Sequence, residues 1–122
     1  MTNAFFFDSY ALIEITNGNP LYKKYTGYEI ITSKLNIFEV YYSLIKNNKF
    51  SQAEEFLEKG YLYIVDFSRD EIKVAAEFKN KHKKINLSMT DCIGYAISLK
   101  FGIKFLTGDK EFEKFDNVEF VK

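Results

Sequence analysis

Short apolar segments alternate with helical patterns along the whole of this 122-residue chain. The first segment, residues 4–7, is an unbroken run of Ala and Phe, as expected of a strand that is buried on both faces of a sheet. Further strands are predicted over residues 28–32, 61–67, 103–106 and 118–121. Strands that alternate with helices predict an α/β fold, a three-layer α/β/α sandwich around a mainly parallel sheet with right-handed crossovers.

The segments between these strands carry helix signals. Helices are predicted over residues 10–17, 35–46, 51–60, 68–82, 88–101 and 110–115. Capping-box patterns precede two of them, Ser51 with Glu54 and Ser68 with Glu71. In the second helix an apolar stripe is predicted at helical spacing, formed by Leu35, Phe38, Tyr42 and Ile45. No repeat or linker is visible, so we expect a single domain over residues 1–122.

Composition narrows the class of protein. The chain is 47% hydrophobic, with 13 Phe and 9 Tyr, which argues against disorder. No apolar run is long enough to cross a bilayer, and residues 1–7 lack the basic leader of a secretory signal, so we expect a cytoplasmic protein without membrane association. The formal net charge is zero and Arg69 is the only arginine. We therefore do not expect arginine contacts to bases or phosphates to dominate any binding of nucleic acid.

Four acidic residues lie where a predicted strand ends or a predicted helix begins: Asp8, Glu39, Asp91 and Asp109. The carboxyl ends of parallel strands meet at one edge of a sheet, so these side chains are expected to gather there. Gathered carboxylates repel one another and resist burial, and a divalent cation relieves both costs. Mg²⁺ or Mn²⁺ suits an all-oxygen ligand set and supports hydrolysis of phosphate esters. Ser9 and Thr107 are placed to position a water or a phosphate beside such an ion.

Other catalytic patterns compete poorly. The chain lacks the glycine-rich loops of nucleotide-binding proteins and the Gly-x-Ser-x-Gly elbow of serine hydrolases. A phosphatase of the haloacid-dehalogenase type would need Asp-x-Asp after the first strand, and Tyr10 occupies the second acidic position. The lone Cys92 is interpreted as a small core residue, and His82 as a solvated helix end.

The ordered acids resemble those of the PIN-domain family of metal-dependent ribonucleases, and within it the small VapC-type toxins. The likeness rests on four segments that cover nearly the whole chain: Phe5-Phe6-Phe7-Asp8-Ser9, Thr32-Ser33 with Asn36-Ile37-Phe38-Glu39-Val40, Leu87 to Ala96, and Phe105-Leu106-Thr107-Gly108-Asp109 with Phe112. Gly94 departs from the family pattern, because relatives usually fill this helix position with Ala or Leu; Tyr10 departs too, standing where many relatives carry a small or polar residue.

The resemblance implies a metal-dependent endoribonuclease, the toxin of a type II toxin–antitoxin pair. It implies that Asp8, Glu39, Asp91 and Asp109 bind Mg²⁺ or Mn²⁺ and act on single-stranded or looped RNA. It also implies a homodimer and a small antitoxin protein that blocks the site. Two alternatives stay open: an RNA-processing nuclease without an antitoxin, and a noncatalytic PIN-like module that binds RNA or protein.

Each acid also has a purely structural interpretation. Asp91 completes a Ser88-x-x-Asp91 capping box, and Asp109 could cap the short helix that follows it. Glu39 could be a surface residue paired with a lysine. Asp8 is the hardest to explain in this way, because an acid directly after a buried strand needs a partner.

Overall fold

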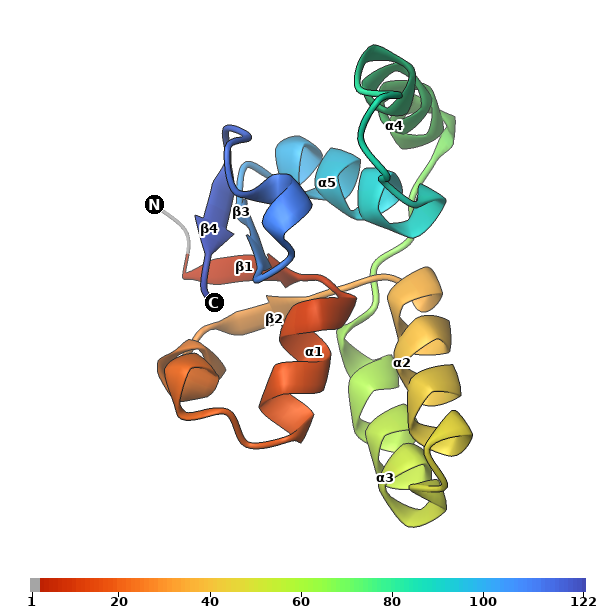
Figure 1. Cartoon of the computed structure of the whole chain (residues 1–122), viewed down its shortest axis with the longest axis vertical. Helices are drawn as coiled ribbons and strands as arrows, with labels where there is room; N and C mark the ends of the chain where they lie inside the picture. Colours follow the sequence, from red (N-terminus) through yellow and green to blue (C-terminus); the bar gives the residue numbers. More distant parts are fainter. Residues whose placement is uncertain (1–2) are drawn as a thin grey trace.

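A four-stranded parallel sheet forms the centre of the protein in a computed structural model that describes residues 3–122 (Figure 1). Its strands follow the spatial order β2-β1-β3-β4, and each neighbouring pair is parallel. The register places Phe6 of β1 beside Ile31 of β2 and Phe105 of β3. The strands are β1 (Ala4–Phe7), β2 (Glu29–Ile31), β3 (Lys104–Thr107) and β4 (Val118–Phe120).

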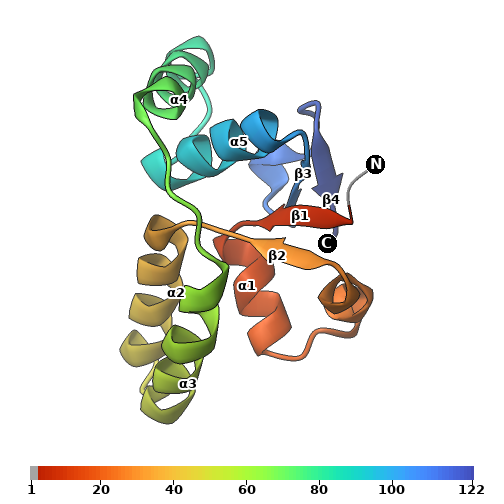
Figure 2. The ribbon, with the colours of Figure 1, turned by 180° about the vertical axis from the view of Figure 1, so that it is seen from behind.

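Helices cover both faces of this sheet, so the predicted three-layer α/β/α architecture is confirmed (Figures 1 and 2). The α-helices are α1 (Ser9–Thr16), α2 (Lys34–Lys46), α3 (Phe50–Gly60), α4 (Arg69–Lys81) and α5 (Met89–Phe101). Three shorter 3₁₀ segments complete the chain: η1 (Pro20–Gly27), η2 (Tyr61–Tyr63) and η3 (Lys110–Phe112). Within residues 3–122, no helix combines the length and the apolar character needed to cross a membrane.

The core lies in two clusters, one on each face of the sheet. Phe6 and Phe105 belong to the cluster under α5 and η3, whereas Phe7 and Leu106 belong to the cluster under α1, α2 and α3. All four side chains are fully buried. Successive residues of a strand point to opposite faces, which explains why β1 is a continuous apolar run rather than an alternating one.

The strand predicted over residues 61–67 is wrong. Tyr61–Tyr63 forms the 3₁₀ segment η2, and beyond it only Ile64 pairs with Thr32 in an isolated parallel bridge. Val65 and Phe67 pack against the α5-side core, and the chain then enters α4. The apolar pattern of this segment therefore reflects core packing beside the end of β2, not an extra strand.

Two details of the helices also differ from the sequence expectation. On α2 the buried apolar residues are Ile37, Val40 and Leu44, whereas Phe38 is 70% exposed and Tyr42 is 53% exposed. Helix α3 begins at Phe50, after Lys49, and Lys49 makes no side-chain capping bond, so the capping box predicted at Ser51 is absent. The other two residues of the predicted stripe, Leu35 and Ile45, are half-buried and pack against the core, so the predicted stripe is only partly confirmed.

Candidate metal centre

Three strands end at the same edge of the sheet, and each is followed by a residue of the candidate site. Strand β1 leads into Asp8, β2 leads through Thr32 into Ser33, and β3 leads through Gly108 into Asp109. Asp8 and Ser33 are the N-caps of α1 and α2, so two helices also begin at this edge (Figure 1). Helix N-termini carry partial positive charge, which favours carboxylates and phosphates near them.

Asp8 is the most deeply buried of the four acids, with 2% of its surface exposed. Its Oδ1 accepts a hydrogen bond of 2.8 Å from the backbone N–H of Ala11. Burial raises the pKa of this carboxyl to about 8, although hydrogen bonds from Thr107 and Ala11 oppose the shift. The charges of Asp91 and Asp109 raise the pKa further. Asp8 is therefore a carboxyl group that a nearby cation would stabilise in its charged form.

Asp91 and Asp109 serve as helix caps, as their structural interpretations predicted. Asp91 Oδ2 accepts from the Ser88 N–H at 3.0 Å in a complete capping box of α5, and Asp109 Oδ1 accepts from the Glu111 N–H at 3.0 Å. Burial raises the pKa of Asp91, hydrogen bonds from Ser88 lower it, and the charges of Asp109 and Glu39 raise it. A carboxylate has about four acceptor positions, so a capping bond leaves it able to bind a metal or water.

Glu39 contacts Ser9 rather than a lysine. The Ser9 hydroxyl donates to Glu39 Oε1 at 2.6 Å, and Ser9 accepts from Asn36 Nδ2 at 3.1 Å. The Ser33 hydroxyl donates to Asn36 Oδ1 at 2.6 Å. Sequence reasoning placed Ser9 at the site but missed Ser33 and Asn36, because a polar residue at a helix start has the same sequence signal as an ordinary cap.

Thr107 is buried and connects two of the acids. Its hydroxyl hydrogen-bonds the Asp8 carboxyl, and its oxygen accepts from the Asp109 N–H at 3.0 Å. Thr107 was predicted to position a water or a phosphate, and that role stays a prediction. Both bonds of its hydroxyl are made within the protein. The observed contacts order the turn between β3 and Asp109.

The chemistry of this group fits a hard divalent cation. Its donors are carboxylate and hydroxyl oxygens, which Mg²⁺ and Mn²⁺ prefer. Among residues 3–122, however, no three His, Cys, Asp or Glu side chains stand close enough together to form a ready-made metal site. Charges nevertheless couple Asp8 with Asp91 and Asp109, and Asp91 with Glu39. Mg²⁺ retains several waters, which can span the remaining gaps between these side chains.

The other residues considered for chemistry have structural roles. Cys92 is buried in the α5-side core, as predicted. His82 is not simply solvated, because its ring packs between Phe78 and Phe115, with centroids 4.8 and 4.7 Å away.

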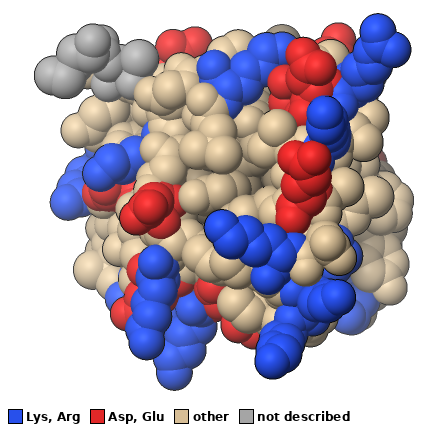
Figure 3. Space-filling view, turned by 90° about the horizontal axis from the view of Figure 1, so that it is seen from above, with Lys and Arg blue, Asp and Glu red and all other residues tan. Residues whose placement is uncertain are grey.

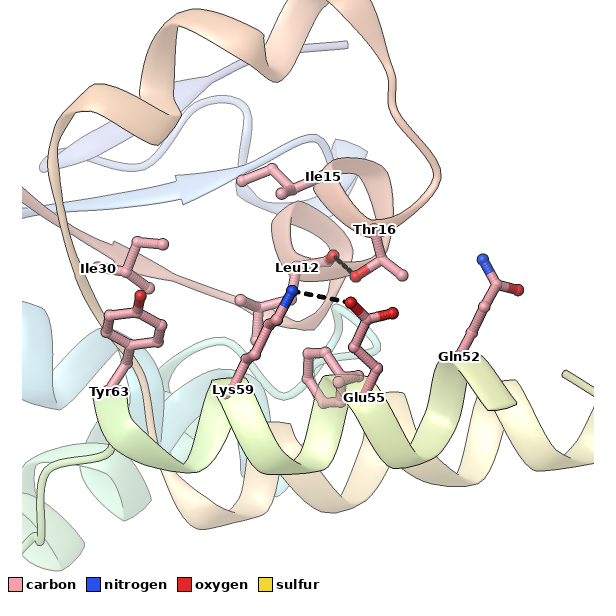
Figure 4. Close-up of a pocket in the computed structure, with 10 residues that line it drawn as sticks. Leu12, Ile15, Thr16, Ile30, Gln52, Glu55, Lys59 and Tyr63 are labelled. Carbon is pink, nitrogen blue, oxygen red and sulfur yellow. Dashed lines mark hydrogen bonds and ion pairs between the residues drawn. The ribbon is translucent and has the colours of Figure 1, made fainter. Parts of the chain in front are cut away.

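A separate pocket of about 320 Å³ lies between α1, β2 and α3 (Figure 4). Leu12, Ile30 and Phe56 give it a largely apolar lining, and the Lys59–Glu55 ion pair stands at its side. None of the four acids lines it. On the face drawn in Figure 3, basic and acidic side chains are interspersed around an uncharged area, so phosphate attraction on that face would rest on individual lysines.

Comparisons with known proteins agree with this fold. A family model described as PIN domain matches residues 5–118. The fold is similar to a toxin–antitoxin complex from Klebsiella pneumoniae, with a TM-score of 0.73 and 19% identity over 94% of this chain and 95% of the other. It is also similar to Mycobacterium tuberculosis VapC20, a sarcin–ricin loop cleaving toxin, with a TM-score of 0.75 and 18% identity over 93% and 98%. The curated proteins searched by sequence contain no match.

Proposed function

Because the chain belongs to the PIN domain family, we propose that it is a metal-dependent endoribonuclease and the toxin of a type II toxin–antitoxin pair. The observation that carries the nuclease proposal is the burial of Asp8 at the end of β1, under the influence of the charges on Asp91 and Asp109. A buried carboxylate that is also repelled by two other negative charges is costly, and a cation would relieve that cost.

Asp8, Asp91 and Asp109 would hold Mg²⁺ or Mn²⁺, and Glu39 would share metal binding with orientation of a water. The ion would lower the pKa of a water and offset negative charge on the phosphodiester. The chain's own groups prepare this arrangement. Thr107 fixes Asp8 and the turn before Asp109, and Ser9 holds one oxygen of Glu39. The N-terminus of α2 beside these groups would attract the phosphate.

The two structural neighbours support the toxin part of the proposal. One is a toxin–antitoxin complex and the other is a toxin that cleaves the sarcin–ricin loop. By analogy, this chain would cleave single-stranded or looped RNA in the cytoplasm, form a homodimer and be inhibited by a small antitoxin protein.

The test is cleavage of RNA by the wild-type protein with Mg²⁺ or Mn²⁺, compared with Asp8→Asn and Asp91→Asn. We expect metal-dependent cleavage, abolished by a chelator and reduced at least 100-fold by either substitution, since each removes a charge from the metal ligands. Absence of cleavage by the wild type, or full activity of both variants, would refute the nuclease proposal and favour a noncatalytic binding module.

Glu71→Gln is a matched control for Asp91→Asn. Glu71 is the acid of the α4 capping box, just as Asp91 is the acid of the α5 capping box, but it pairs with Lys100 instead of facing the candidate site. Loss of a capping acid should therefore lower stability in both variants and reduce cleavage only in Asp91→Asn.

A further inference from the structure

A directed chain of side-chain hydrogen bonds runs from the start of α2 to Glu39. Ser33 Oγ bonds Asn36 Oδ1 at 2.6 Å, Asn36 Nδ2 bonds Ser9 Oγ at 3.1 Å, and Ser9 Oγ bonds Glu39 Oε1 at 2.6 Å. These hydrogen bonds join α2 to Ser9, the first residue of α1, which lies 27 positions before Asn36. Asn36, one of the two middle members of this hydrogen-bonded chain, is only 1% exposed.

The direction of every bond follows from the backbone. The Asn36 N–H can only donate, and it points at Ser33 Oγ at 3.4 Å, so the Ser33 hydrogen is available for Asn36 Oδ1. The amide nitrogen of Asn36 then faces Ser9 and can only donate to it. Ser9 has a single hydroxyl hydrogen, and that hydrogen is consequently directed to Glu39.

We propose that Asn36 is a positioning residue, which fixes the Ser9 hydroxyl as a donor to Glu39 and so orients the Glu39 carboxylate for a divalent cation. This inference rests on the proposed metal-dependent function. It goes beyond it by giving a role to a residue that is neither an acid nor a metal ligand. Asn36 leaves Ser9 one free lone pair, which can accept a hydrogen bond from a bound water.

Burial explains why this arrangement matters. A buried amide without partners is costly, whereas Asn36 has a partner at each end. With Asn36 replaced, the Ser9 hydroxyl is free to rotate away from Glu39, and the carboxylate loses a fixed orientation. Groups that orient metal ligands in this way typically change metal affinity by roughly 10–100-fold.

The experiment measures Mn²⁺ dissociation constants by titration calorimetry on the full chain without RNA. The variants are Asn36→Ala, Ser9→Ala and the double substitution, which together form a double-mutant cycle. We expect Asn36→Ala to weaken Mn²⁺ binding roughly 10-fold or more. The double variant should bind no more weakly than Ser9→Ala alone, because Asn36 acts through Ser9.

Ser98→Ala is the control for loss of a buried polar contact. Ser98 is fully buried in α5, donates to Tyr95 O and accepts from Asn117 Nδ2, and none of these partners belongs to the candidate site. It should lower the unfolding temperature and leave Mn²⁺ affinity unchanged. If Asn36→Ala does not fold, Asn36→Thr, which has nearly the same volume but cannot bridge Ser33 and Ser9, replaces it in the cycle.

Unchanged Mn²⁺ affinity in the folded Asn36 variant would overturn the inference. So would a double variant whose loss of Mn²⁺ affinity equals the product of the losses in the two single variants. Absence of Mn²⁺ binding by the wild type would overturn it as well. RNA cleavage by the wild type is measured separately. A protein that binds Mn²⁺ with the expected Asn36 dependence but cleaves no RNA would retain this inference and lose the proposed nuclease function.

Discussion

Asp8 combines two roles at one position, because it caps α1 and also introduces an acid into a buried site. Asn is as good an N-cap as Asp, so the two roles can be separated by substitution. Asp8→Asn keeps an oxygen for the Ala11 N–H but removes the charge that burial opposes.

Asp8→Asn should stabilise the metal-free protein at neutral pH. The pKa of Asp8 is about 8 in the folded state against an ordinary value of 3.8, so the folded protein binds the extra proton. The stability that protonated Asp8 contributes is thus fully present below about pH 4. It is lost as pH rises towards 8, by at most about 1.4 kcal/mol per pH unit. Chemical denaturation between pH 5 and 8 should show this decline in wild type and a smaller decline in the variant.

Asp66→Asn is the control, because Asp66 is exposed and should leave the decline intact. The same pH dependence in wild type and Asp8→Asn would contradict a strongly raised pKa of Asp8. Added Mn²⁺ should flatten the wild-type decline, since the ion favours the charged carboxylate.

Gly94 shows how a departure from a family pattern can have a packing reason. A Cβ at this position would lie 2.7 Å from Phe6 Cε1 and 3.1 Å from Phe105 Cε1. Both rings are fully buried and cannot move aside easily. Glycine weakens a helix, but at Gly94 it lets α5 pack closely against the sheet.

Gly94→Ala should destabilise the protein by about 1–3 kcal/mol, because overpacking outweighs the gain in helix propensity. Thermal unfolding measures the effect. Gly27→Ala is the matched control, since a Cβ there meets nothing within 4 Å, and it should change stability little. A stabilised Gly94→Ala protein would show that Phe6 and Phe105 can rearrange.

At the scale of the elements, one of two similar capping-box sequences forms its hydrogen bonds and the other does not. Ser88 and Asp91 form both bonds of a capping box, each at 3.0 Å. Ser51 has the same sequence pattern but lies inside α3, which starts one residue earlier, at Phe50. Ser88→Ala should therefore cost about 1 kcal/mol of unfolding free energy, and Ser51→Ala should be neutral or slightly stabilising. Equal losses in urea denaturation would contradict this distinction.

The elements also show what a sequence can predict. β1, β3 and the helices were predictable because their apolar periods and terminal signals are local. Residues 61–67 were not, because an apolar segment can equally fill the core without joining the sheet. The candidate acids were predictable from their positions at strand ends and in helix starts, whereas the bonding of Asn36 to Ser9 depends on how α1 and α2 pack.

For the whole molecule, exposed apolar side chains are the feature most relevant to assembly. Phe38, Tyr42, Tyr61 and Leu62 are all more than half exposed, and Leu62 reaches 80%. Phe38 and Tyr61 line a common depression with Ile37 and Leu57, so part of this surface, on α2, α3 and η2, is continuous. The exposure of Tyr42 (53%) and Tyr61 (51%) is compatible with a role at an interface.

The proposed homodimer should use this surface. Leu62→Glu places a charge among exposed apolar groups and should shift the protein towards monomer, because a charge buried at an interface loses its hydration. Multi-angle light scattering after gel filtration measures the mass across a range of concentrations. Leu21→Glu is the control, because Leu21 is also more than half exposed, at 54%, but lies on η1 and not on α2, α3 or η2. A wild-type monomer would refute the homodimer, and a dimer that survives Leu62→Glu would place the interface on another face.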